Sequence, residues 1–241
     1  MVRILLSYNA DPRKRDSHQR TALHFASYAE SDKCSGEHAF PEDRACATVK
    51  LLLDSAPDMI DQRDEDGATP LLFAAKTIRT TFSILNLLHQ RGADITAADN
   101  NHENALHLAA SDSHDYPSLG VHDIHESIRY LVQNGVGLEG KQKLGATPLI
   151  LALTRGEQSS DVVDALLRNG ADVRAALEGG MTALHCAYSK GYQDGIGKVL
   201  LSYGADLGAK DEKGRVPADC IPKREAAFRR GRGRGVFTAS V

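Results

Sequence analysis

Three histidines recur at one position of a repeated phrase, and histidine is the side chain best suited to proton transfer and metal binding near neutral pH. His24, His107 and His185 each follow a leucine and precede an apolar residue and an alanine. They belong to separate copies of the phrase, too far apart in the chain to share a ligand. Leu72 and Ile150 occupy the same place in two other copies, which a chemical role would not tolerate. We therefore expect these histidines to be structural.

A denser group of possible metal ligands lies between residues 112 and 126. It contains His114, His122, His125, Glu126, Asp112, Asp115 and Asp123. Histidines at a spacing of three can share a helix face, and imidazole with carboxylate suits zinc. The order is not the His-Glu-x-x-His of a metalloprotease, because the glutamate follows the second histidine. A solvated loop whose acids favour the start of the next helix explains the same residues, so we predict no metal and no cofactor.

Other signatures of catalysis are missing from the sequence. It has no Gly-x-Gly-x-x-Gly after a strand and no Gly-Lys-Ser/Thr, the two common phosphate-binding loops. No serine or cysteine stands in a nucleophile setting. We therefore name no catalytic residue and predict that the protein is not an enzyme.

The four cysteines lack the paired spacing of metal or redox motifs and are read as thiols of a reducing compartment. No run approaches eighteen apolar residues, so no transmembrane helix is expected and no membrane partner is predicted. We expect the protein in the cytoplasm or nucleus.

The C-terminal segment 223–241 is basic and rich in arginine and glycine. Six Lys or Arg against one Glu give residues 221–235 a net charge of +5, and since the chain totals −3, the remainder carries −8. Such Arg/Gly segments resemble those that bind RNA without sequence preference. A solvated, disordered tail is the simpler interpretation, so we expect at most weak, non-specific nucleic-acid contact.

The elements that would position any site are marked by the repeated phrase Thr-Pro-Leu-His-x-Ala. Its copies begin 34 to 48 residues apart. The copies start at Thr21, Thr69, Asn104, Thr147 and Thr182, with an eroded sixth at Val216. Thr or Asn can cap a helix N-terminus with its side-chain oxygen, and Pro fits the first helical position. The phrase therefore predicts a helix start in every copy.

This phrase, at a period of about 33 residues, is typical of ankyrin repeats, and the chain resembles the ankyrin-repeat family over nearly its whole length. The resemblance implies an all-α repeat fold, an ankyrin-type solenoid of stacked helix–turn–helix units with short β-hairpin-like connecting turns. It also implies that the recurring histidines hydrogen-bond between a helix and the neighbouring turn.

The phrase and the turn residues between its copies divide the chain into units. We expect the outer half of a truncated repeat at 1–15, repeat 1 at 16–63 with an insertion at 31–44, repeat 2 at 64–98, repeat 3 at 99–141 with an insertion at 111–126, repeat 4 at 142–176, repeat 5 at 177–210, a degenerate terminal repeat at 211–222 and the basic tail at 223–241. The first insertion is expected to be disordered and the second partly ordered, since loops of this length are functional or disordered.

The resemblance implies a non-enzymatic module that binds another protein through its concave face and hairpin tips. The inner-helix and tip positions then predict a partner-binding set of Tyr28, Lys76, Arg155, Lys190, Glu65, Asp66, Asn101, Glu103, Leu144 and Met181. Two alternatives stay open: the chain is the recognition fragment of a larger multidomain protein, or it is a nucleic-acid-associated protein working through the Arg/Gly tail. The sequence does not identify the partner.

Overall fold

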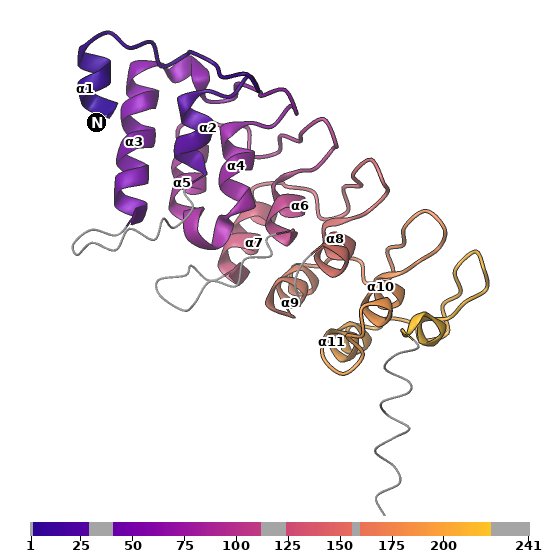
Figure 1. The fold of residues 1–241 in the computed structure, drawn as a ribbon. Helices are drawn as coiled ribbons and strands as arrows, with labels where there is room; N and C mark the ends of the chain where they lie inside the picture. Colours follow the sequence, from indigo (N-terminus) through magenta and orange to yellow (C-terminus); the bar gives the residue numbers. More distant parts are fainter. Residues whose placement is uncertain (1, 29–40, 112–123, 156–159, 223–241) are drawn as a thin grey trace, which may run out of the picture.

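The computed structural model describes residues 2–28, 41–111, 124–155 and 160–222, which form two layers of short helices stacked in one elongated row (Figure 1). The inner layer contains α2 (Ala22–Ser27), α4 (Pro70–Lys76), α6 (Ala105–Ala110), α8 (Pro148–Thr154) and α10 (Ala183–Ser189). The outer layer contains α1 (Val2–Ser7), α3 (Pro41–Ser55), α5 (Ile78–Gln90), α7 (Ile124–Gln133), α9 (Ser160–Arg168) and α11 (Ile196–Ser202). Each helix packs mainly on its repeat partner and on the neighbouring helices of its own layer.

The inner helices begin where the repeated phrase predicts, because the signals are local. Pro70 and Pro148 are the first residues of α4 and α8. Thr69 Oγ1 accepts a hydrogen bond from Leu72 N at 3.4 Å, which pairs one of the backbone N–H groups that a helix start leaves free. The eroded copy also starts a helical turn, the 3₁₀ segment η2 (Pro217–Cys220), which packs on α10.

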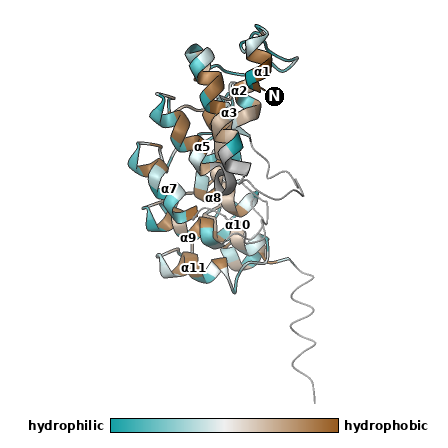
Figure 2. Cartoon of the chain, turned by 90° about the vertical axis from the view of Figure 1, so that its left-hand side faces the viewer, coloured by the Kyte–Doolittle hydropathy of each residue, from teal (hydrophilic) through white to brown (hydrophobic). Residues whose placement is uncertain are grey.

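The hydrophobic core is continuous along the row, between the two layers and between successive repeats. Leu71, Leu88, Leu106, Leu131 and Leu149, drawn from both layers, have at most 1% of their surface exposed. Hydrophobic residues lie along the helices and hydrophilic residues gather at the turns (Figure 2). As in other repeat arrays, each unit is therefore stabilised chiefly by its neighbours.

The described residues include six hairpin tips defined by their backbone bonds, and the tips project from one side of the row (Figure 1). Each tip spans five residues and is closed by a hydrogen bond from the N–H of its first residue to the carbonyl of its fifth. We number them as first (16–20), second (64–68), third (99–103), fourth (142–146), fifth (177–181) and sixth (211–215). The described residues form no strand longer than an isolated bridge, of which there are two, Ala98 with Asn104 and Ala176 with Thr182.

Backbone hydrogen bonds join most successive tips into a ladder. The donors and acceptors are Glu65 N to His18 O (3.0 Å), Asn100 N to Asp66 O (2.8 Å), Lys143 N to Asn101 O (2.9 Å) and Glu212 N to Gly179 O (3.0 Å). Within the described residues, no backbone bond of this kind joins the fourth tip to the fifth.

Both predicted insertions differ from the structure at their ends. The first, expected at 31–44, is too long, because α3 already begins at Pro41, a residue pre-set for the first helical position. The second, expected at 111–126, is wrong at both ends, since Ser111 caps α6 and α7 begins at Ile124. The expectation that the first insertion is disordered and the second partly ordered concerns mainly residues 29–40 and 112–123, which lie outside the described residues.

Candidate functional site

Each recurring histidine forms a bridge between two repeats. In His107, Nδ1 accepts from Asn104 N at 3.2 Å, while Nε2 lies 3.2 Å from Ala146 O in the next tip. Because a carbonyl only accepts, Nε2 carries the proton and the ring is neutral. His24 and His185 bridge in the same way, to Ala68 O at 3.2 Å and Arg215 O at 3.0 Å. All three are fully buried, and both ring nitrogens are engaged, so the rings brace neighbouring repeats and face no substrate.

Burial also affects the protonation of two of these rings, those of His24 and His107. Burial, which penalises the charged imidazolium, lowers the pKa of His24 and His107 below the ordinary value for histidine. A neutral ring is the form that both hydrogen bonds of the bridge require.

Only two residues of the possible zinc cluster lie within the described residues. His125 and Glu126 lie in the first turn of α7, and His125 Nε2 is 4.0 Å from Asp164 Oδ2 on α9. His114, His122 and the three aspartates lie outside the described residues. In the part of the chain that is described, no three His, Cys, Asp or Glu side chains are placed to hold a metal ion.

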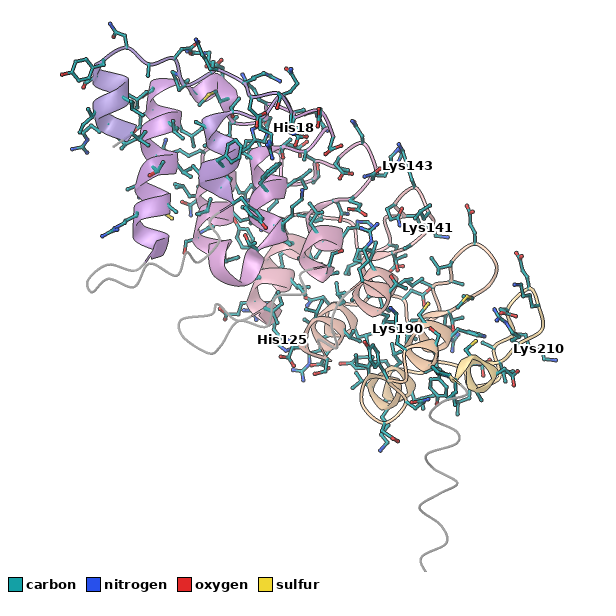
Figure 3. All side chains as sticks on the ribbon, in the orientation of Figure 1. His18, His125, Lys141, Lys143, Lys190 and Lys210 are labelled. Atoms are coloured by element: carbon teal, nitrogen blue, oxygen red, sulfur yellow. The ribbon has the colours of Figure 1, made fainter. Side chains whose placement is uncertain are left out.

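The predicted partner-binding residues come from the ends of the inner helices, whose surface we call the concave face, and from the hairpin tips. Lys76 ends α4 and Lys190 caps α10, and both side chains are exposed (Figure 3 labels Lys190). Tyr28, which caps α2, is half-buried, and its ring packs edge-on against Phe73 at a centroid distance of 6.3 Å.

Glu103 differs from the expectation that it is presented at a tip. Only 6% of the residue is exposed, and its Oε1 accepts a hydrogen bond from Arg155 Nη1 at 2.6 Å. Arg155, which caps α8, reaches across from the next repeat, and its side chain stays 49% exposed. The two residues are therefore brought together as an internal ion pair, and Glu103 is not available to a partner.

The remaining predicted tip residues lie on the outer edge of the ladder. Glu65, Asp66 and Asn101 are exposed. Leu144 is 71% exposed at the fourth tip. Met181, expected to be exposed beside it, is instead half-buried and packs against the core.

A hollow of about 520 Å³ lies where the first two tips meet α2 and α4. Its tip side is lined by His18, Arg20, Asp64, Glu65 and Asp66, and its helix side by Phe25, Tyr28, Phe73 and Lys76. Sequence reasoning missed the two phenylalanines, because they stand at an apolar position of the phrase that is read as core. The available signal was that this position is aromatic in the first two repeats, whereas Leu108, Leu151 and Cys186 occupy it in the next three.

The comparisons with known proteins agree with this geometry. A family model for ankyrin repeats (3 copies) matches residues 39–117 and 118–211. The crystal structure of the human ASB11 ankyrin repeat domain superposes with a TM-score of 0.72 at 22% identity, covering 98% of this chain and 93% of that one. At that identity the likeness concerns the fold.

Two curated relatives match only in part of their own length. Palmitoyltransferase AKR1 of Lachancea kluyveri is 29% identical over 188 residues, which are 78% of this chain and 24% of that protein. B-cell lymphoma 3 protein of Homo sapiens is 31% identical over 191 residues, 76% of this chain and 36% of that protein. This chain thus spans well under half of either relative. Among the helices of the described residues, none is long and apolar enough to cross a bilayer.

Proposed function

The chain belongs to the ankyrin-repeat family, and on that premise we propose that it is a non-enzymatic module that binds a partner protein with its concave face and hairpin tips. Ankyrin repeat domains typically mediate protein–protein interaction. The proposed contact residues are the exposed members of the predicted set, with Glu103 left out because it is buried. Arg155 remains in the set, because its side chain is 49% exposed and only its Nη1 bonds Glu103, so its other N–H groups can contact a partner.

The observation that carries this proposal is the exposure of Leu144. This leucine precedes the glycine of the fourth tip and is 71% exposed. The equivalent residues of the other tips, none of which has an apolar side chain, are His18, Asp66, Asn101, Gly179 and Lys213. Burying this exposed side chain in an interface would contribute about 1.5–3 kcal/mol to binding.

The test captures partners with the full-length chain as bait and then measures the affinity of each captured protein. Leu144→Asp places a charge where the apolar anchor would be buried, so we expect the affinity to fall at least about ten-fold. Leu207→Asp is the matched control, because Leu207 is also exposed, at 51%, in the turn that follows α11. Both variants should keep wild-type stability, since exposed substitutions usually change it by no more than about 0.5 kcal/mol. Equal affinity for both variants would contradict the proposal.

A second candidate is that the chain is the recognition part of a larger multidomain protein. This is favoured by the match to 24% and 36% of the two curated relatives, each of which contains much sequence beyond the matched region. The complete transcript tests it, because a reading frame that continues beyond these residues into another domain is the expected result. A transcript that encodes these 241 residues alone would reject it.

We also propose a cytoplasmic or nuclear location. Cys46, Cys186 and Cys220, the cysteines within the described residues, are not joined in disulfides, which suits a reducing compartment. Imaging a tagged full-length chain in cells tests this, and a secreted or luminal signal would contradict it.

A further inference from the structure

The hollow between the first two tips and the helices α2 and α4 has an aromatic wall that already holds cations. The guanidinium carbon of Arg20 lies 4.7 Å from the centre of the Phe25 ring, and Lys76 Nζ lies 4.7 Å from the centre of the Phe73 ring. These distances are those of cation–π contacts. The wall is therefore suited to receive positively charged groups.

The two cations differ in whether a carboxylate also binds them. Arg20 Nε donates to Asp16 Oδ2 at 2.9 Å, and Nη2 of the same guanidinium is 2.8 Å from that oxygen. Arg20 is thus fixed by a charged partner within its own tip. Lys76 is exposed, and within the described residues no carboxylate pairs with it. Its ammonium group can leave the Phe73 ring without breaking an ion pair to any described residue.

The tip side of the hollow carries an excess of negative charge. Asp64 is occupied within its tip, since its Oδ1 accepts from Asp66 N at 3.0 Å and from Ala68 N at 2.8 Å. Glu65 contacts the ring of His18, the residue labelled at the first tip in Figure 3. The carboxylate of Asp66 is exposed and accepts no hydrogen bond from any described residue. The lining thus carries three carboxylates against the single cation Lys76, since Arg20 is matched by Asp16, and this excess of negative charge attracts a further cation.

From this combination we propose that the hollow receives an arginine side chain of the partner protein. The inference rests on the proposed function and assigns the chemistry of one part of the same surface. Arginine fits both walls, because its planar guanidinium stacks on aromatic rings and offers paired N–H donors to a carboxylate. The guanidinium would lie against Tyr28 and Phe73 and donate to Asp66, displacing Lys76 from the Phe73 ring.

The displacement of Lys76 distinguishes this proposal from an acidic partner. If an arginine enters, Lys76 is a competitor for the ring and a source of repulsion. If a carboxylate enters, Lys76 is its natural partner. Removing the Lys76 side chain therefore changes the affinity in opposite directions for the two kinds of partner.

The test titrates the blocked peptide Ac-Gly-Ser-Arg-Ser-Gly-amide into the full-length chain and follows backbone amide shifts by NMR. Two further peptides carry lysine or glutamate in place of the arginine. We expect the arginine peptide to shift the amide of Gly67 in the second tip and to leave Gly214 in the sixth tip unchanged. The lysine peptide should bind more weakly, and the glutamate peptide should not bind.

Three variants complete the test. Asp66→Asn should weaken binding of the arginine peptide about five-fold, the effect of one charge pair about 4 Å apart when fully screened by bulk water. Lys76→Ala should strengthen it about two- to five-fold, the effect of removing an exposed cation–π competitor. Glu212→Gln, an exposed acid at the sixth tip, is the matched control and should change nothing.

Several outcomes would overturn the inference. They are tighter binding of the glutamate peptide, weaker binding after Lys76→Ala, equal shifts at both tips, or no saturable shift at about 10 mM arginine peptide, far above the range of specific recognition. The proposed function stands or falls separately, on whether Leu144→Asp releases a captured partner.

Discussion

Replacing Arg155 with alanine removes the counter-ion of a nearly buried carboxylate, and the cost can be worked out from the geometry. The Glu103 side chain is only 8% exposed, whereas that of Arg155 is 49% exposed, and the two meet at 2.6 Å. Breaking a fully buried pair costs about 3–5 kcal/mol. A hydrogen bond to a charged group contributes about 1.5–3 kcal/mol. Because about half of the Arg155 side chain is exposed to water, we expect Arg155→Ala to lower the free energy of unfolding by the smaller of these amounts, about 1.5–3 kcal/mol.

The exposure difference also predicts that the two sides of the pair are not equivalent. Glu103→Gln removes the buried charge and leaves an arginine that water can solvate, so it should cost less than Arg155→Ala. Arg129 and Glu126 on α7 are a control pair at 3.4 Å with both side chains more than half exposed. Arg129→Ala should therefore change stability by no more than about 0.5 kcal/mol.

Urea unfolding followed by circular dichroism measures all three variants. With a slope of about 3 kcal/mol per molar urea, Arg155→Ala should lower the midpoint by about 0.5–1 M, while Arg129→Ala should leave it almost unchanged. The reasoning would be refuted if Glu103→Gln were as destabilising as Arg155→Ala, or if Arg155→Ala matched the wild type.

Three further predictions concern the core, the bridging histidines and the tips. Leu166→Ala deletes a side chain with no exposed surface and should cost about 2–5 kcal/mol in urea unfolding; an unchanged midpoint would contradict it. Burial lowers the pKa of His107 in the folded state. Below about pH 6.5 the unfolded state therefore binds more protons than the folded state, and the free energy of unfolding decreases as the pH is lowered. His107→Leu should flatten that acid limb in melts from pH 7.5 to 5, and an equally steep limb would refute this. Gly67→Ala should cost over about 1 kcal/mol, because φ is +75° and its Cβ would lie 2.4 Å from Asn100 Oδ1. Gly214→Ala, at φ +72° with nothing within 4 Å, should cost less, and the reverse order would contradict the account.

The fold could be predicted because the signals that specify it are local. A cap and a proline one residue apart, as in Thr69 and Pro70, determine where α4 begins without any knowledge of the rest of the chain. The periodic return of that signal then predicts the stack. Even the eroded copy at Val216 and Pro217 starts a helical turn.

The details of the surface depend on contacts between repeats, which the sequence does not display. Glu103 stands at a tip position, but Arg155, 52 residues later, covers it. Phe25 and Phe73 occupy the same place in the phrase, yet one is 51% exposed and the other 9%. Phe73 is covered by the rings of His24 and Tyr28 from α2. Since α2 is the first inner helix of the described chain, Phe25 has no such cover.

The interrupted ladder of tips gives the array links of unequal stiffness. Between the first and second repeats, a backbone bond at the tips and the bridge from His24 act together. Between the fourth and fifth, neither kind of bond is present in the described chain, because Ile150 replaces the bridging histidine and the ladder is broken. There the repeats are joined by the packing of α8 on α10, and by Tyr203 Oη, which lies 3.3 Å from Asp164 Oδ1. A pulling force or a bending motion along the row would therefore concentrate at this joint. The last repeats would swing as one arm, which would alter the curvature of the array without unfolding any single unit.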